Sequence, residues 1–117
     1  MKPMKHVKEQ RRHSRHRAPS GLNMRLRQDP PTEDDDLTLT CRDISRAGLG
    51  VELPYSIRPD TDVELWLQLP NQGEALHLFG TIAWCAEGAQ RWSAGIALDL
   101  ERTDGALWAA RFDDPDV

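Results

Sequence analysis

A chain of 117 residues has room for one domain with a modest hydrophobic core. Hydrophobic residues make up 38% of the chain and charged residues 29%, proportions that are typical of a soluble globular protein. No apolar run approaches the roughly 18 residues of a membrane helix, and no stretch of signal-peptide type follows the basic first residues. We therefore expect a cytoplasmic protein without a membrane span.

The formal net charge of -4 hides a strong asymmetry along the chain. Residues 1–28 contain nine Lys or Arg and one acidic residue, a balance of +8, whereas residues 29–117 contain six and eighteen, a balance of -12. Proteins that wrap duplex DNA need a broad basic face, which the acidic remainder does not offer. The asymmetry predicts a basic arm ahead of an acidic body and argues against a DNA partner.

Residues 1–20 contain seven Lys or Arg, three His and only scattered apolar groups. Such a segment cannot bury enough surface to offset the entropy lost on ordering, so we expect a flexible arm over residues 1–20 when no ligand is bound. Within it, Arg11-Arg12-His13-Ser14-Arg15 places arginines four residues apart. Guanidinium groups form planar, paired hydrogen bonds to phosphates and to guanine edges. The string therefore suits an anionic ligand that contains guanine.

Apolar and polar residues alternate in six segments of the remaining chain, which is the period of half-buried strands. Residues 29–36 are acidic and interrupted by two prolines, which indicates a solvated loop. The predicted strands cover residues 21–28, 37–42, 49–53, 62–69, 75–86 and 91–100. The pattern predicts an all-β domain over residues 21–117, either an antiparallel sandwich or a small barrel.

The inner face of this domain is predicted from the strand alternation, which is clearest in residues 62–69. We expect its core to contain Val63, Leu65, Leu67, Ile96 and Leu98. After the last strand, Thr103 is predicted to cap a short helix that ends at Arg111.

A second string, Asp43-Ile44-Ser45-Arg46-Ala47-Gly48, falls in the predicted turn between two strands. It offers a carboxylate acceptor, a hydroxyl donor and a glycine where a ligand can approach the backbone closely. Asp43 can also serve only to cap its own turn. Together with the arginines of the arm, the string predicts a site for a small anionic molecule that contains guanine.

The orientation of Trp84 stays open. Strict alternation from Leu76, Leu78 and Ile82 places Trp84 inside the domain. A bulge near Gly80 would instead turn it to the outer surface, where it could border a ligand.

No group in the sequence predicts catalysis or metal binding. Cys41 and Cys85 lack the paired spacing of a zinc site or a disulfide scaffold. His13 and His16 are three residues apart but have no further ligands nearby in the sequence. Ser45 is not in the Gly-x-Ser-x-Gly setting of a nucleophile. We therefore expect a binding protein without a metal, a further cofactor or an enzymatic activity.

The order of these features resembles the PilZ family of bacterial cyclic di-GMP receptors. An Arg-x-x-x-Arg string is followed by a strand, an acidic loop, a second strand and an Asp-x-Ser-x-x-Gly string. The matching residues are Arg11 and Arg15 in the first string and Asp43, Ser45 and Gly48 in the second. Doubled arginine at Arg11-Arg12 is also usual in that family. Gly-Thr-Ile-Ala-Trp at 80–84 and Ser-Ala-Gly-Ile-Ala-Leu at 93–98 resemble its later strands.

The resemblance implies a six-stranded antiparallel barrel over residues 21–117, with a short C-terminal helix and a flexible arm that folds over cyclic di-GMP on the outer surface. It implies a binding set of Arg11, Arg12, Arg15, Asp43, Ser45, Gly48, Trp84 and Gly95. In that set the arginines hold phosphates and guanine edges, Asp43 accepts from guanine N–H groups, and Ser45 donates to a polar edge. Signalling would follow from ordering of the arm and altered contacts with a downstream protein.

Two other functions remain as alternatives. The first is a PilZ-like adaptor that works through protein contacts without a ligand, although degenerate members typically lack one of the two strings. The second is a small barrel that binds nucleic acid through its basic arm. Such barrels interleave aromatic and basic residues, and residues 1–20 contain no Phe, Tyr or Trp.

Overall fold

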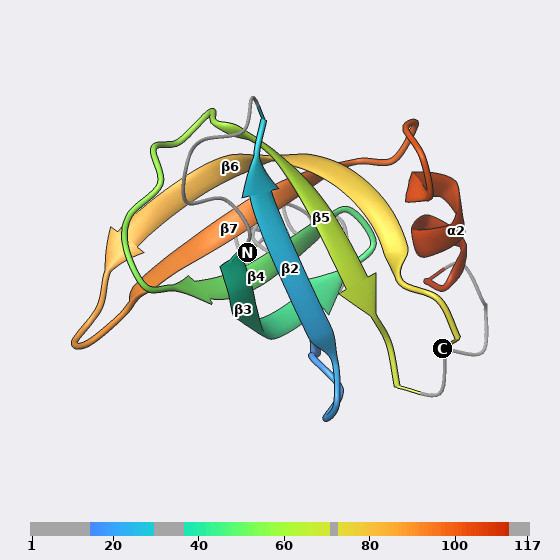
Figure 1. The fold of residues 1–117 in the computed structure, drawn as a ribbon, viewed down its shortest axis with the longest axis horizontal. Coiled ribbons are helices and arrows are strands. Elements are labelled where there is room, and N and C mark those ends of the chain that lie inside the picture. The colour runs from blue at the N-terminus through green and yellow to red at the C-terminus, as the bar shows by residue number, and fades with distance from the viewer. Residues whose placement is uncertain (1–14, 30–36, 71–72, 113–117) are drawn as a thin grey trace, which may run out of the picture.

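The computed structural model describes residues 15–29, 37–70 and 73–112. Within these ranges the strands form one antiparallel sheet in the order β1-β3-β2-β5-β6-β7-β4, and β3 also pairs with β4. Strands β2 to β7 therefore close into a six-stranded barrel, which confirms the fold that the resemblance implies (Figure 1). The elements are β1 (His16–Arg17), β2 (Asn23–Gln28), β3 (Leu37–Ser45), β4 (Gly48–Leu53), β5 (Asp62–Gln68), β6 (Leu76–Glu87), β7 (Trp92–Asp99) and α2 (Gly105–Ala110).

The barrel interior is filled by alternate residues of the strands, as a period of two requires. Leu65 of β5 is fully buried and pairs with Leu26 of β2 and Leu78 of β6, so three strands contribute to one layer of the core. Leu98 is only partly buried and packs against the core from its margin. The predicted core is confirmed for Val63, Leu65, Leu67 and Ile96.

The C-terminal helix α2 packs beside β6 with Trp108 fully buried (Figure 1). Thr103 does not cap it, contrary to the sequence prediction, because the helix begins after Asp104 and has no side-chain cap bond. The Thr103 hydroxyl donates to the carbonyl oxygen of His77 (2.5 Å), and the Asp104 carboxylate accepts from the His77 N–H (2.8 Å). Both side chains tie the start of the helix to β6 instead of capping it.

The described end of the basic arm forms a strand that the sequence pattern does not predict. His16 and Arg17 of β1 pair with Ile44 and Asp43 of β3. Strand β2 pairs with the first residues of β3 along one edge, and β4 pairs with β3 along the other edge. Strand β1 pairs with later residues of β3 along the same edge as β2. Residues 1–14 lie outside the described residues, and the flexibility expected of the arm stays a prediction.

Candidate ligand-binding site

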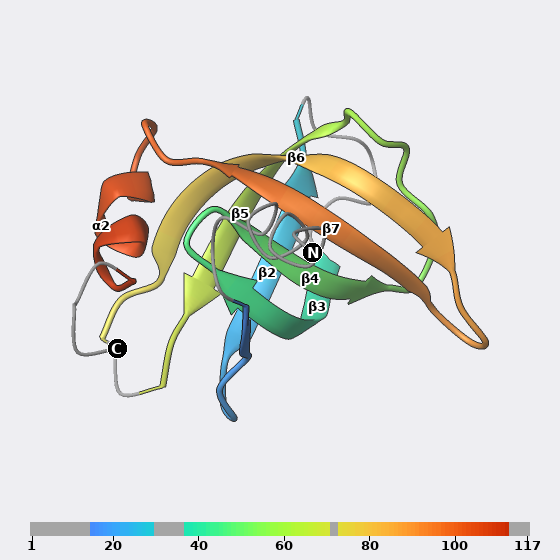
Figure 2. The same cartoon turned by 180° about the vertical axis from the view of Figure 1, so that it is seen from behind.

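The candidate site lies on the outer surface of the barrel, where β3, β4, β7 and β6 run side by side (Figure 2). Gly50 of β4 pairs with Gly95 of β7, Asp43 of β3 pairs with Gly50, and Trp84 of β6 pairs with Gly95. Directly paired residues of antiparallel strands direct their side chains to the same face. The four residues therefore form one row across four strands. We call Gly50 and Gly95 the two-glycine floor.

Neighbouring side chains require glycine at both positions of the two-glycine floor. A Cβ atom at Gly50 would lie 2.7 Å from Asp43 Oδ1, and one at Gly95 would overlap the indole of Trp84. The side chain of Asp43 thus covers Gly50, and the side chain of Trp84 covers Gly95. Trp84 is 44% exposed, so part of it remains accessible to a ligand. The row combines a hydrogen-bond acceptor, a flat backbone surface and an aromatic ring.

Two β-bulges turn Asp43 and Trp84 to the outer surface. The pairing of β3 with β4 shifts by one residue at Arg42, and the pairing of β6 with β7 shifts by one residue at Ala83. Cys41 packs against the core, so uninterrupted alternation would place Asp43 in the core as well. One extra residue exchanges the two faces of every later residue in a strand. Each end of the row therefore depends on one bulge.

The bulge in β6 decides the orientation of Trp84, which alternation left open. Ile82 is fully buried, and a strict period of two would bury Trp84 with it. The extra residue is Ala83, rather than a residue near Gly80. Trp84 consequently faces outward, while its contact with a ligand stays a prediction.

The second string does not lie entirely in a turn, which corrects the sequence prediction. Strand β3 continues through Ser45 and β4 begins at Gly48, so only Arg46 and Ala47 connect them. Ser45 pairs with Gly48, and its hydroxyl donates to the Gly48 carbonyl oxygen (3.2 Å). A two-residue connection lets the ladder of a hairpin continue to its end. Asp43 is therefore held by a paired strand and not by a loop.

Arg15, in the first string, forms an ion pair with the carboxylate of Asp43, in the second string. Arg15 Nη1 lies 2.5 Å from Asp43 Oδ1, and the two side chains are 46% and 28% exposed. Further along the arm, the N–H of Ala18 donates to the carbonyl oxygen of Arg42 at the β3 bulge (3.0 Å). The structure thus joins two residues that are 28 positions apart in the sequence.

A profile of the PilZ domain family matches residues 9–110. The chain belongs to the PilZ family. Among solved structures, it is similar to the inhibitor of motility MotI/DgrA of Bacillus subtilis, with a TM-score of 0.66 and 13% sequence identity. The match covers 88% of this chain and 48% of that one, so this chain spans about half the length of MotI/DgrA and the likeness shows the fold alone. No curated protein matches the chain.

PilZ domains are ligand-binding or adaptor modules rather than enzymes, and the family is associated with cyclic di-GMP and with protein partners. In this PilZ domain, four members of the implied binding set meet at the two-glycine floor: Arg15, Asp43, Trp84 and Gly95. Ser45 lies two residues after Asp43 and Gly48 two residues before Gly50, and the two pair at the hairpin end. Arg11 and Arg12 lie outside the described residues. The contacts of all eight with a ligand stay predictions.

The thiol of Cys41, two residues before Asp43, is partly buried against the core. Burial, and to a smaller extent the Asp43 carboxylate, raises the pKa of Cys41 to about 12. The thiol is therefore protonated at neutral pH, and Cys41 Sγ lies 3.6 Å from the Asp43 carbonyl oxygen, to which it donates. In the described ranges, no three His, Cys, Asp or Glu side chains gather as metal ligands. Nor does any helix there have the length and apolar character to cross a membrane.

Sequence reasoning missed three residues of this region of the PilZ domain. Gly50 is one of the two glycines of the floor. The sequence could have indicated it through the alternation of Gly48 and Gly50, because glycine inside a strand marks a position where another group approaches the backbone closely. Arg42 is the extra residue of the β3 bulge, which no local pattern reveals. Trp108 Nε1 donates to the Ser45 carbonyl oxygen (3.1 Å), which ties α2 to the end of β3 across 63 residues of sequence.

Proposed function

We propose that this PilZ domain binds cyclic di-GMP on the two-glycine floor. The row of Asp43, Gly50, Gly95 and Trp84, with Arg15 paired to Asp43, is the observation that carries the proposal. The exposed indole suits stacking on a guanine base, and the carboxylate suits guanine N–H donors. Because the two glycines have no side chains, the Asp43 carboxylate and the Trp84 indole can lie close to the strands, where the exposed part of the ring can receive a flat base.

Binding exchanges the partners of Arg15 and Asp43. Their ion pair is partly exposed, and such pairs contribute only about 0–1 kcal/mol to stability, so a ligand can replace the pair at small cost. Asp43 then accepts from guanine, while Arg15, joined by Arg11 and Arg12, donates to phosphate and to guanine acceptors. Each charge-assisted hydrogen bond contributes about 1.5–3 kcal/mol, against about 1–2 kcal/mol for each residue of the arm that becomes ordered. We expect an affinity near micromolar, about -8 kcal/mol.

Ordering of the arm is the proposed signal. The C-terminal part of the arm lies next to the site, since β1 pairs with Asp43 and Ile44 of β3. It also reaches the C-terminal region, where the ring of His16 lies 5.8 Å from the ring of Phe112. A ligand that fixes the arm therefore changes a surface made of both ends of the domain. A downstream protein that reads this surface, and a cytoplasmic location, stay predictions.

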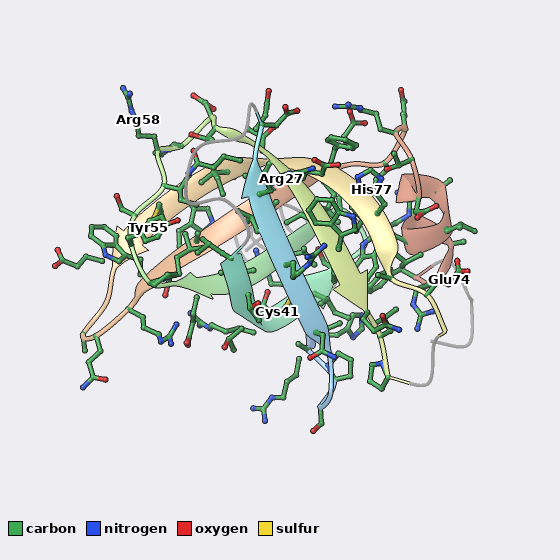
Figure 3. All side chains as sticks on the ribbon, in the orientation of Figure 1. Arg27, Cys41, Tyr55, Arg58, Glu74 and His77 are labelled. Carbon is green, nitrogen blue, oxygen red and sulfur yellow. The ribbon has the colours of Figure 1, made fainter. Side chains whose placement is uncertain are left out.

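Titration calorimetry with cyclic di-GMP tests the proposal. The wild-type protein should bind it, while cyclic di-AMP and GTP should bind far more weakly, because groups placed for guanine would be left unpaired. Arg15→Ala and Asp43→Ala should each weaken binding at least about tenfold, the loss expected for one charge-assisted contact. Arg58→Ala is the charge-matched control, since Arg58 is exposed and points away from the barrel (Figure 3).

Equal affinity for cyclic di-AMP would contradict the guanine-reading role of Asp43 and Arg15. Absence of any cyclic di-GMP binding would leave the ligand-independent adaptor as the function. Amide hydrogen exchange adds a readout of the signal: residues 9–18 should exchange more slowly with ligand, while the barrel strands should change little.

A further inference from the structure

Arg42 stands at the β3 bulge directly before Asp43, and its side chain points across the outer surface. Arg42 Nη1 donates to Ser93 Oγ at 3.0 Å. Ser93 lies on β7, two residues before Gly95, so the Arg42 side chain crosses β4 to the strand that carries half of the two-glycine floor. Its guanidinium group therefore borders the floor along the side between Asp43 and Trp84.

The Arg42 guanidinium is oriented without being neutralised. Ser93 is uncharged, and the described ranges contain no ion pair between Arg42 and the neighbouring Glu52. By contrast, Arg15 pairs with Asp43 and Arg27 pairs with Glu64. A guanidinium has five N–H donors, and the bond to Ser93 uses only one of them. Arg42 thus retains its positive charge and most of its donors for a ligand.

The backbone of Arg42 is fixed as well. Its carbonyl oxygen accepts from the N–H of Ala18 in the arm (3.0 Å), and its neighbours Cys41 and Asp43 are paired with β4. The side chain is held at its tip and the backbone is held at the bulge. Such a residue loses little further freedom when it binds a ligand.

Arg42 supplies a donor that reaches Ser93 on β7, and Asp43 supplies an acceptor over Gly50 on the neighbouring strand β4. A donor and an acceptor on the same face complement one edge of guanine. Guanine presents its O6 acceptor beside its N–H donors, whereas adenine presents an amino donor in place of O6. We propose that Arg42 donates to O6 of a guanine base of cyclic di-GMP and is a specificity-determining residue. This inference rests on the proposed function, because it assigns a further role within the same site.

Calorimetry on Arg42→Ala, with both cyclic di-GMP and cyclic di-AMP, tests the inference. Affinity for cyclic di-GMP should fall about tenfold, which is the discrimination expected from one good arginine contact to a base edge. Affinity for cyclic di-AMP, measured by competition, should change less than about twofold, because adenine offers no O6. Arg58→Ala should leave both affinities unchanged, and thermal unfolding should show that both variants keep the fold.

Two further variants separate recognition from charge. Arg42→Lys keeps the positive charge without the planar fork, so its affinity for cyclic di-GMP should stay at least about threefold below wild type. Ser93→Ala should cause a smaller loss than Arg42→Ala, because Ser93 acts only by orienting Arg42.

Three results would overturn the inference while leaving the proposed function intact. They are wild-type affinity in Arg42→Ala, an equal loss for both dinucleotides (the signature of a phosphate contact), and full recovery in Arg42→Lys. If the wild-type protein does not bind cyclic di-GMP at all, both proposals fail together.

Discussion

Large side chains cover the outer face of the barrel over β2, β5 and the first half of β6, where Figure 3 labels Arg27 and His77. Arg25, Trp66 and His77 form one cross-strand row, with Arg25 4.9 Å above the Trp66 ring and the rings of Trp66 and His77 stacked at 5.4 Å. In the next row, Glu64 accepts from Arg27 (3.0 Å) and is bonded to His77 (2.5 Å). The polar and aromatic groups of this face are partners of one another.

The outer face over β3, β4, β7 and the second half of β6 is arranged differently. Two glycines occupy the middle of its central row, with a carboxylate (Asp43) and an indole (Trp84) at the ends. Asp43 has a partner from the arm, in Arg15, and not from the adjacent strand. Asp43 and Trp84 lie over the two glycines, which are buried, and the exposed surface of this face is formed by the carboxylate and the indole.

The contrast shows how one sheet can carry a face of interacting side chains and the face proposed to bind the ligand, with the same alternation of residues. A row filled by interacting side chains adds cross-strand stability and leaves no surface for a flat ligand. A row with glycine at its centre lacks those interactions and lets the side chains at its two ends lie close to the strands. Glycine at Gly50 and Gly95 makes the difference, together with the bulges that aim the residues at the ends.

The largest effect on cyclic di-GMP binding should come from placing a side chain at a glycine of the two-glycine floor. Gly95→Val places a branched side chain where the Trp84 indole now lies, so it displaces the ring on which the base is proposed to stack. We expect cyclic di-GMP affinity to fall at least about a hundredfold by calorimetry, roughly 2.7 kcal/mol. The matched control is Gly73→Val, where a Cβ atom would meet nothing within 4 Å. Retention of affinity within about threefold in a folded Gly95→Val protein would show that the floor is not the contact surface.

Removing one tryptophan from each face sharpens the comparison. Trp84→Ala should weaken cyclic di-GMP binding about tenfold or more, because stacking of a base on an aromatic ring contributes about 1–3 kcal/mol. Trp66→Ala should leave binding within about twofold. In urea unfolding the order should reverse: Trp66→Ala should lower the free energy of unfolding by about 1–3 kcal/mol through lost ring and cation contacts, and Trp84→Ala by less. The same binding loss in both variants would refute the assignment of separate roles to the two faces.

The smallest expected effect is a pH dependence of the stability that Glu64 contributes on the outer face over β2, β5 and the first half of β6. Partial burial alone would raise the pKa of Glu64, but hydrogen bonds from His77 and Arg27 and their charge outweigh it and lower the pKa below its ordinary 4.5. Because the folded-state pKa is lower than that of the unfolded chain, this stabilisation is fully present above about pH 4.5 and is lost as the pH falls through the folded-state value.

Urea unfolding of wild type and Glu64→Gln measures this contribution. The difference in stability should be largest near about pH 6 and should shrink toward about pH 3. Glu74→Gln, at an exposed residue before β6 (Figure 3), should show no such trend. A difference that stays constant across the range would mean that the Glu64 carboxylate is not held ionised by its partners.

The strands and most of the core were predictable from the sequence because alternation is a local property of the chain. Leu65 and Leu67 are buried as predicted, and the six predicted strands match β2 to β7. The family was also recognisable, since the two strings on which the resemblance rested are short and ordered along the chain. Thr103 shows the limit of local rules: it has the right type for a helix cap, but the carbonyl oxygen of His77 takes its hydroxyl.

By itself, the sequence determined which residues form the barrel, which chemistry the two strings offer, and that the arm and the body differ in charge. Only the tertiary structure decided how those groups face one another. Single extra residues at Arg42 and Ala83 turn Asp43 and Trp84 outward, and the register of four strands brings Gly50 and Gly95 between them. Bulges and register depend on pairing between distant strands, and a shift of one residue exchanges the core and solvent faces, so local alternation cannot specify them.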